Sequence, residues 1–455
     1  MIMNKIYNRR DFMKFSTHSI TYDTDSSGNS FPKEASMQTR TDGKPIRLGF
    51  VGIGNRGAYH LTTALSIEGV EIPALCEVQP DRLYQAKRWV EAAGLPTPRL
   101  YGNGPTDYLR LCQDEDLDAI ICVTPWQYHT PVCLAAMRSN KHAVSEVPIV
   151  ITLDEAWDLI ETYESTGKWA TIGLEGMGDS SLLRMIQKGM LGEIVHAETG
   201  YVHDLRQVKF DPGHEPWRIQ HSLDRNGNLY PDHPMAKILP ATDINHGDRI
   251  DYLVSMSSSS VMLNDFAGVN YGKDSFYAKS KFALGDYNAT LMRTVNGKMI
   301  TLNHDTSTPH PREDFRLQGT KGIYLSDDVG KRIYLEGVSP EEHTWEPADK
   351  YLAANRPPVK PDLPLRKGVK LIGEGYYSSD NKPDKGLITQ IPSNWQSLIS
   401  ALREKRLPVW DVYDSITSSA ISPLTEISVA DKCKPVDFPD FTKGKWKTSP
   451  RITLG

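Results

Sequence analysis

The stretch Ile46-Arg-Leu-Gly-Phe-Val-Gly-Ile-Gly-Asn-Arg-Gly57 decides the fold of this chain. An apolar run leads directly into a Gly-x-Gly-x-x-Gly turn made by Gly52, Gly54 and Gly57. A second apolar run, Val70–Cys76, is followed at once by Glu77. In a strand–turn–helix unit the three glycines permit a tight turn, close approach of a pyrophosphate and close helix packing, and the acid accepts hydrogen bonds from a ribose diol. The pattern predicts a dinucleotide site that favours NAD over NADP, because Glu77 would repel a 2′-phosphate.

Residues 46–174 alternate between strand and helix patterns. Further apolar runs predict strands at Ala119–Thr124, Ala143–Ser145 and Ala170–Leu174, and the first strand at Arg47–Ile53. Apolar residues recur at helical spacing in Pro80–Ala93 and Leu153–Thr166, and Thr152 with Glu155 forms a capping box before the second of these helices. This regular alternation predicts a doubly wound parallel sheet, the α/β Rossmann architecture.

The pattern changes after about residue 193. Two-residue alternation predicts strands at Ile194–Tyr201, Ser275–Ala283, Ala289–Arg293, Met299–His304 and Phe315–Gly319. Residues 339–393 are rich in Pro, Gly and Lys and predict an irregular excursion, and helical patterns follow at Ser393–Glu404 and near Val412–Asp431. We therefore expect an NAD-binding Rossmann domain over 46–174 and a substrate-binding α+β domain with a mostly antiparallel sheet over 175–447.

Composition excludes several classes of partner. The chain has 455 residues and a net charge of −5 without a long basic run, which argues against nucleic acid. No stretch approaches the ~20 apolar residues of a membrane span. The five cysteines include no Cys-x-x-Cys pair, so buried free thiols are expected rather than disulfides or zinc. The sequence leaves the oligomeric state open, a homo-oligomer included.

The first 45 residues predict a disordered segment outside the fold. Asn8-Arg-Arg-Asp-Phe-Met-Lys14 resembles a twin-arginine export motif. The residues that follow are polar, whereas a working signal needs an apolar segment there. A degenerate signal is therefore favoured slightly over a functional one, and the location stays open between cytoplasm and periplasm.

Candidate site residues follow the apolar runs, because ligands bind beyond the carboxyl ends of parallel strands. Trp126 and His129 are expected on the nicotinamide side of the cleft, although packing of Trp126 and helix capping by His129 are the alternative. Glu146 directly follows a buried strand and is expected to contact cofactor or substrate, with a solvated loop acid as the alternative.

Residues 196–249 hold the densest group of polar and aromatic side chains. Six of the thirteen His of the chain lie here. Such groups bind sugar hydroxyls and move protons near neutral pH. No compact ligand pair such as His-Glu-x-x-His occurs, so we predict no metal site. The group comprises His196, Tyr201, His203, Asp204, Arg206, Trp217, Arg218, His221, Tyr230, Asp232, His233, Asp243, Asn245, His246, Asp248 and Arg249.

These motifs resemble a known superfamily and one branch of it. The glycine turn, Thr124-Pro-Trp-Gln-Tyr-His129 and Glu146-Val147-Pro148 resemble the sugar oxidoreductases related to glucose–fructose oxidoreductase and inositol dehydrogenase. Most of those enzymes have lysine where this chain has Val147. Glu-Val at this place, together with Asn226-Gly-Asn-Leu-Tyr-Pro-Asp-His233 and Asp243-Ile-Asn-His-Gly-Asp248, is typical of glycoside hydrolase family 109.

The resemblance implies an activity and a set of site residues. Family members are NAD-dependent N-acetylgalactosaminidases that oxidise the sugar, eliminate the C1 substituent, add water and reduce the product, so NAD is recycled. Implied contacts to NAD are Gly52, Gly54, Asn55, Arg56, Gly57, Glu77, Trp126, Gln127, Tyr128, His129, Glu146, Val147 and Gly176. Implied contacts to the sugar are Tyr201, Arg218, Tyr230, Pro231, Asp232 and His233, of which His233 and Tyr230 are the candidate catalytic residues.

Three departures concern the sugar side. The family carries an insertion after Leu-Glu with a tyrosine proposed as the base, whereas Leu174–Leu183 here is shorter and has no tyrosine. The family's Arg-Pro-Tyr is missing from Ser307–Asp314, and its Gly-His-Gly-Gly is replaced by Gly373-Glu-Gly-Tyr-Tyr377. Two alternatives therefore stay open: a sugar oxidoreductase with net turnover, and a non-catalytic NAD- or sugar-binding relative.

Overall fold

A computed structural model describes residues 44–176, 178–211, 215–309, 315–358, 362–373 and 386–452. The predicted twin-arginine motif and residues 374–377 of the Gly373–Tyr377 element lie outside the described residues, as do residues 310–314. In the described part of the chain, no helix is long and apolar enough to cross a membrane. All five cysteines are free thiols, and four of them are buried.

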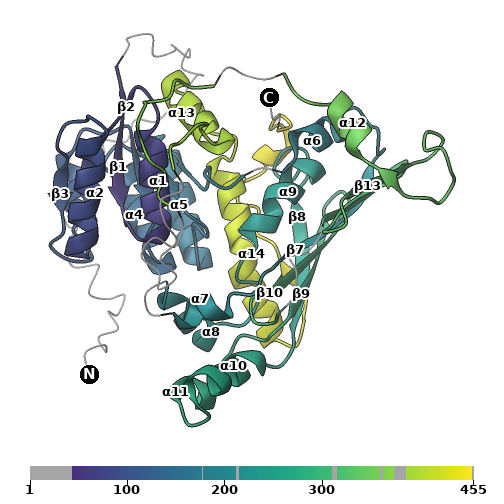
Figure 1. The fold of residues 1–455 in the computed structure, drawn as a ribbon. Coiled ribbons are helices and arrows are strands. Elements are labelled where there is room, and N and C mark those ends of the chain that lie inside the picture. Colours follow the sequence, from purple (N-terminus) through teal and green to yellow (C-terminus); the bar gives the residue numbers. More distant parts are fainter. Residues whose placement is uncertain are drawn as a thin grey trace, which may run out of the picture. The chain divides into compact units, whose positions relative to one another are not determined.

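The first sheet is six-stranded and entirely parallel, in the order β3-β2-β1-β4-β5-β6 (Figure 1). Its strands are β1 (Ile46–Val51), β2 (Val70–Cys76), β3 (Arg99–Tyr101), β4 (Ala119–Cys122), β5 (His142–Ser145) and β6 (Ala170–Thr171). The helices between them are α1 (Asn55–Leu65), α2 (Pro80–Ala92), α3 (Tyr108–Asp114), α4 (His129–Arg138) and α5 (Leu153–Thr166), with a 3₁₀ turn at Trp126–Tyr128. This is the predicted doubly wound Rossmann arrangement.

Local sequence explains the element boundaries. The Thr152 side chain accepts from Glu155 N and the Glu155 carboxylate accepts from Thr152 N, so the predicted capping box starts α5. Gly167 ends that helix in the left-handed conformation. Strands β1, β4 and β6 stop earlier than their apolar runs: β6 ends at Thr171, and Ile172–Leu174 already belongs to the loop that leads toward the second half. The apolar runs include these loop residues because the loop is buried too.

The second sheet has nine strands in the order β14-β13-β12-β11-β7-β10-β9-β8-β15. All pairings are antiparallel except the parallel pair β7–β10, which agrees with the predicted mostly antiparallel sheet. The strands are β7 (Ile194–Val202), β8 (Ile250–Ser257), β9 (Asn288–Thr294), β10 (Met299–Asp305), β11 (Phe315–Gly319), β12 (Gly322–Ser326), β13 (Lys331–Leu335), β14 (Glu346–Pro347) and β15 (Val436–Asp437).

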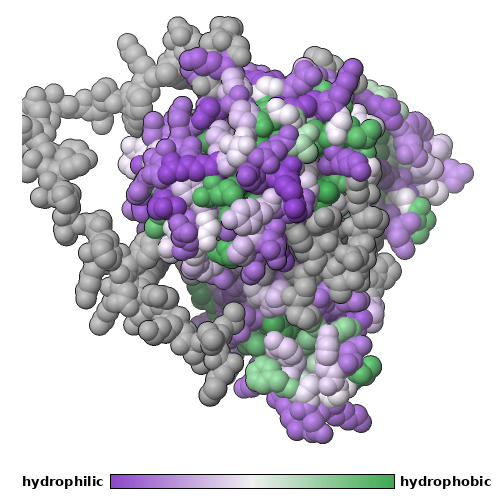
Figure 2. Space-filling view, turned by 60° about the vertical axis from the view of Figure 1, so that its left-hand side comes forward, coloured by the Kyte–Doolittle hydropathy of each residue, from purple (hydrophilic) through white to green (hydrophobic). Residues whose placement is uncertain are grey.

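One predicted strand of this half is wrong. Residues 275–283 form a short helix, α11 (Phe276–Lys279), because the Ser275 hydroxyl caps it by accepting from Ala278 N. The remaining helices are α6 (Ser180–Gln187), α7 (Arg206–Phe210), α8 (Trp217–Asp224), α9 (Asp232–Thr242), α10 (Met262–Tyr271), α12 (Asp349–Ala354), α13 (Ser393–Glu404) and α14 (Val412–Ala430), with a 3₁₀ turn at Lys445–Lys447. On the face drawn in Figure 2, hydrophilic residues predominate and hydrophobic residues form small separate patches.

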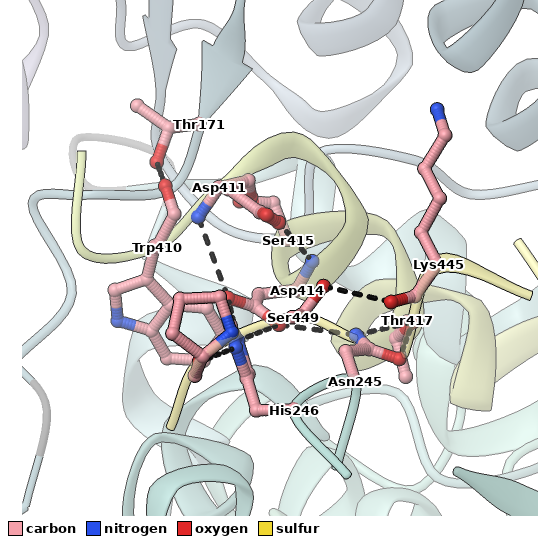
Figure 3. A network of polar contacts seen from close by, with 11 residues as sticks. Thr171, Asn245, His246, Trp410, Asp411, Asp414, Ser415, Thr417, Lys445 and Ser449 are labelled. Atoms are coloured by element: carbon pink, nitrogen blue, oxygen red, sulfur yellow. Dashed lines mark hydrogen bonds and ion pairs between the residues drawn. The ribbon is translucent and has the colours of Figure 1, made fainter. Parts of the chain in front are cut away.

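Helix α14 joins the two sheets. It packs against β8 and α9 on one side and against α5 and β6 on the other (Figure 1). At its start, Thr171 Oγ1 donates to Trp410 O at 2.7 Å, and Asn245 Nδ2 donates to the buried Asp414 at 3.0 Å (Figure 3). These contacts tie β6, α14 and the loop after α9 into one polar network.

His246 completes this network. Its Nδ1 lies 2.6 Å from Pro450 O and its Nε2 lies 3.2 Å from Asp414 Oδ2 (Figure 3). Because both ring nitrogens face acceptors, the doubly protonated imidazolium satisfies both contacts. Burial opposes the charge, but the Asp414 carboxylate outweighs burial and raises the pKa of His246 to about 9. His246 is therefore a structural cation that holds the C-terminal segment.

Candidate functional site

A cavity of about 1100 Å³ opens at the carboxyl ends of the parallel strands, between the first sheet and the start of α9. Most of the predicted site residues line it, from both halves of the chain. They are Gly52, Gly54, Asn55, Arg56, Glu77, Trp126, Tyr128, His129, Glu146, Val147, Tyr201, Arg218, Tyr230 and His233. Residues 181 positions apart along the chain, Gly52 and His233, thus share one cavity.

The glycine turn forms one end of this cavity. Gly52 has φ +86°, and a Cβ there would lie 2.4 Å from Val123 O. A Cβ on Gly57 would lie 2.3 Å from Gly52 O, so Gly57 supports the turn from the helix side without lining the cavity. Gly54 precedes α1, and a Cβ there would approach only Arg82 Nη1, at 3.4 Å. Gly54 has no side chain to cover the N-terminus of α1, so the backbone N–H groups there can face an anionic pyrophosphate.

Glu77 holds the turn in place. Its Oε2 accepts from Ile53 N at 2.6 Å and its Oε1 accepts from Gln79 N at 2.9 Å. The residue is only 7% exposed, yet it lines the cavity. A carboxylate has about four acceptor sites, so these two bonds leave capacity for further donors such as ribose hydroxyls. The acid thus has a structural role in the loop besides the predicted ligand contact.

Glu146 lies at the centre of a buried charge cluster. Its Oε1 lies 3.1 Å from Arg56 Nε and 2.6 Å from His60 Nε2, and its side chain is 15% exposed. Burial works to raise the pKa of Glu146, but Arg56 and His60 outweigh it and hold that pKa well below the usual range. The alternative of a solvated loop acid is therefore wrong. Arg56, predicted as a cofactor contact, also serves as the partner of Glu146.

His60 was not predicted from the sequence. It is 2% exposed, and its Nδ1 accepts from Trp395 Nε1 at 3.3 Å. Because an indole can only donate, Nδ1 carries no proton, and Nε2–H donates to Glu146. A signal was present: His60 lies four residues after Arg56, on the same face of the first helix. Its partner Trp395, in α13, is 335 residues away and could not be inferred.

The loop after β4 contributes two site residues: Trp126 packs against other aromatic rings, and His129 faces backbone carbonyl groups. Trp126 is 3% exposed and contacts the rings of Trp217, His221 and Tyr230 at centroid distances of 5.5, 4.5 and 5.0 Å. His129 is buried, with Nδ1 at 2.7 Å from Pro148 O and Nε2 at 2.7 Å from Thr124 O. Burial lowers the pKa of His129 despite these carbonyls. Both ring nitrogens of His129 therefore face backbone carbonyls of the cavity wall, and the neutral ring can donate to one of them.

The opposite wall is aromatic. Tyr201 lies parallel to Tyr230, with centroids 4.7 Å apart and an interplanar angle of 9°, and it stacks on His233 at 4.7 Å. Arg218 Nη1 donates to Tyr230 Oη at 2.7 Å, while Arg218 Nε donates to Glu215. Burial raises the pKa of Tyr230 even though Arg218 opposes the shift. The Tyr230 hydroxyl is therefore a neutral hydrogen-bonding group.

His233 and Glu175 form a dyad that the sequence did not reveal. His233 Nδ1 lies 3.0 Å from Glu175 Oε2, and both residues line the cavity. Burial opposes protonation, but Glu175 outweighs it and raises the pKa of His233. Since Nδ1–H donates to the carboxylate, Nε2 is the nitrogen that can exchange a proton with a ligand. Glu175 belongs to the Leu174–Leu183 stretch that lacks the family tyrosine.

Several predicted residues lie away from the cavity wall. Asp232 is 1% exposed and accepts from Ser419 Oγ at 2.7 Å, so it anchors the start of α9 to α14. Burial raises the pKa of Asp232 to about 6. Of the histidines, His196 contacts Thr301 and His246 contacts Asp414. The predicted contacts outside the lining are Gly57, Gln127, Gly176, Pro231 and Asp232.

Metal ligands do not gather in the part of the chain that the structure describes. No group of three or more His, Cys, Asp or Glu there could hold an ion.

Both parts of the chain match known protein families. Residues 46–174 match the oxidoreductase family with an NAD-binding Rossmann fold, and residues 179–448 match the C-terminal domain of glycosyl hydrolase 109. The alpha-N-acetylgalactosaminidase of Tannerella forsythia is 33% identical over 445 residues, covering 91% of each chain. That of Bacteroides fragilis is 35% identical over 421 residues, covering 88% of this chain and 93% of the relative.

The chain belongs to glycosyl hydrolase family 109.

Solved structures agree with the fold. Levoglucosan dehydrogenase in complex with NADH and levoglucosan aligns with a TM-score of 0.62 at 16% identity, covering 87% of this chain and all of that chain (100%). An inositol dehydrogenase homolog from Azotobacter vinelandii, complexed with NAD+, aligns with a TM-score of 0.60 at 18% identity, covering 87% and 98%. The family 109 chain therefore has an NAD-binding Rossmann domain of the oxidoreductase type.

Proposed function

We propose that this chain hydrolyses N-acetylgalactosaminides by a cycle that uses and regenerates NAD. The observation that carries the proposal is the single cavity that joins the glycine turn of the Rossmann domain to the Glu175–His233 dyad. With NAD bound at the glycine turn, a sugar beside the dyad would have a hydride acceptor on one side and a proton acceptor on the other. The names of the relatives, alpha-N-acetylgalactosaminidase among them, supply the substrate class.

The residues present fit NAD. The bare N-terminus of α1 at Gly54 would receive the pyrophosphate, and the remaining acceptor capacity of Glu77 would bind the ribose diol. Glu146 and Val147 would border the nicotinamide. When bound, NAD would supply a reversible hydride acceptor at this place. Val147 presents no amine at this place, so the proton chemistry falls to the other wall of the cavity.

His233 is the proposed base for the sugar C2 proton. Its Nε2 can take the proton while Glu175 stabilises the imidazolium through Nδ1–H. Tyr230 is a weaker candidate, because its hydroxyl is kept neutral by burial and is bound to Arg218. The stacked pair Tyr201 and Tyr230 would form a wall of the sugar site, and the donors of Arg218 not used by Glu215 and Tyr230 would orient the sugar hydroxyls.

We also propose that the chain has two domains with separate binding roles. Residues 46–174 would hold NAD, and residues 175–447 would hold the sugar. The dyad and the stacked tyrosines then belong to the second domain. Glu146 and its partners belong to the first.

Hydrolysis without added cofactor tests the proposal. Purified protein, its bound NAD quantified after denaturation, is incubated with p-nitrophenyl α- and β-N-acetylgalactosaminides. Release of p-nitrophenol by the wild type supports the proposal if the His233→Gln variant loses this activity while it retains bound NAD. Accumulation of NADH with a free sugar instead indicates an oxidoreductase with net turnover, the second hypothesis. Bound NAD without release from either anomer contradicts hydrolysis and favours a non-catalytic binding relative.

A further inference from the structure

Three Asn-Gly pairs occur in the sequence, at Asn103, Asn226 and Asn296. This dipeptide is chemically labile, because glycine has no side chain to keep its backbone nitrogen away from the amide carbon of the preceding asparagine. Attack by that nitrogen needs an asparagine amide that can move and a glycine N–H that is not already hydrogen-bonded. The structure therefore decides which of the three pairs can react.

The pair at Asn226 is packed in place. Asn226 Oδ1 accepts from Gly285 N at 3.1 Å. Gly227 is buried, and a Cβ on it would lie 2.6 Å from Thr425 Oγ1 and 3.0 Å from Glu426 N. This hydrogen bond and this packing oppose any movement of the amide carbon toward the glycine nitrogen.

The pair at Asn296 is exposed, but both of its reacting groups are hydrogen-bonded. Asn296 Nδ2 donates to Gly247 O at 2.9 Å, and Gly297 N donates to Thr294 O at 3.0 Å. Both bonds must break before the glycine nitrogen can attack the amide carbon. Reaction at Asn296 should therefore be slow in the folded chain.

The pair at Asn103 lies in the loop that follows β3, an edge strand of the first sheet (Figure 1). Asn103 is exposed, and its backbone N donates to Asp107 Oδ2 at 2.9 Å. Across the residues that the structure describes, neither the Asn103 side-chain amide nor the Gly104 N–H has a hydrogen-bond partner. A Cβ on Gly104 would contact no atom within 4 Å. The amide and the attacking nitrogen of this pair are therefore free to meet.

The same loop borders the cofactor cavity. Gly104 and Pro105 line the cavity together with Glu77. Glu77 N donates to Tyr101 O at 3.1 Å, so the loop begins beside the acid that would bind the ribose diol. A change in the main chain between residues 103 and 104 therefore alters a wall of the NAD site.

We propose that Asn103 is a site of spontaneous deamidation and that its isoaspartyl product weakens NAD binding. The Gly104 nitrogen gives up its proton and bonds to Asn103 Cγ, and the side-chain nitrogen leaves as ammonia. Water then opens the cyclic imide at one of its two carbonyls, which yields aspartate or isoaspartate. In isoaspartate the main chain runs through the former side chain and is longer by one carbon. Gly104 and Pro105 are then displaced from the cavity wall.

Peptide mapping by tandem mass spectrometry tests the site. The full-length protein, as isolated, is incubated in mildly alkaline buffer, and aspartate and isoaspartate are measured at all three pairs. We expect Asn103 to react at least about tenfold faster than Asn296, the effect of the two hydrogen bonds that oppose reaction there. In the urea-denatured chain the two rates should become similar, since glycine follows both residues.

Two results would overturn the assignment of the site. One is an equal rate at Asn103 and Asn296 in the folded protein. The other is a folded protein in which Asn103 stays intact while the denatured chain reacts.

Bound NAD, quantified before and after the incubation, tests the consequence. The wild type should lose NAD in proportion to the isoaspartate at residue 103. Asn103→Gln forms the imide far more slowly, because its ring would have one more atom, and it should keep its NAD. Asn296→Gln is the matched control and should lose NAD as the wild type does. Full retention of NAD by wild type that carries isoaspartate would overturn the effect on binding. This measurement involves no glycoside, so its outcome is independent of the proposed glycosidase activity.

Discussion

Replacing Glu175 with glutamine should show that His233 works as a carboxylate-assisted base. The Glu175 Oε2 to His233 Nδ1 distance is 3.0 Å, and the side chains are only 18% and 25% exposed. A hydrogen bond to a charged group in such a site contributes about 1.5–3 kcal/mol. Glu175→Gln keeps an acceptor and removes the charge, so kcat/KM should fall about 10- to 150-fold.

The pH profile distinguishes this role from a structural one. His233 must be neutral to accept a proton, so its raised pKa sets the acid limb of kcat/KM above the usual histidine range. Without the carboxylate, burial dominates and the pKa of His233 falls, so the acid limb should move to lower pH. Glu175→Asp, which keeps the charge, should retain the wild-type limb.

The assay is the pH dependence of p-nitrophenyl N-acetylgalactosaminide hydrolysis, with bound NAD and the melting temperature measured in each variant. Glu336→Gln is the control, because Glu336 is exposed in the turn after β13 and does not line the cavity of the site. An acid limb that stays in place in Glu175→Gln would refute the assignment of His233 as the base assisted by Glu175.

Three further predictions concern the cofactor side and the fold. Gly52→Ala sets a Cβ 2.4 Å from Val123 O at a left-handed φ, so calorimetry should find weak or no NAD binding and a loss of stability of about 1–3 kcal/mol. His60→Leu removes a donor to Glu146 and should weaken NAD binding about tenfold in titration calorimetry, whereas His60→Gln, which keeps a donor, should bind more tightly than the leucine variant. The contact of His246 with Asp414 stabilises the fold fully below pH 6.5, and this stabilisation is lost as pH rises through about 9. Urea titrations should therefore find that the free energy of unfolding of the wild type declines over this range. The decline should be smaller in His246→Asn.

Much of the first half of the chain was predictable because its signals are local. Strand β2 and helix α5 occupy the predicted ranges, since a strand needs an apolar run and a helix needs an amphipathic period, here with a cap. The segment 275–283 misled because a short helix and a strand both accommodate its alternation, and only the Ser275 cap separates them. The glycine turn is predictable for the same reason, because it needs only a residue that tolerates φ +86°, which Gly52 provides.

The partners of the site residues depend on tertiary structure. Glu146 was identified, but its partner His60 reaches it from α1, and Trp395 of α13, far away in the chain, in turn donates to His60. His233 was identified, but its partner Glu175 lies 58 residues earlier in the chain and meets it only in the folded structure. The sequence by itself determined the Rossmann unit with its NAD site, and it indicated the kinds of residue that are proposed to contact a sugar. Tertiary structure decided which carboxylate lies beside the proposed base, because that contact is a distance between elements that no local pattern encodes.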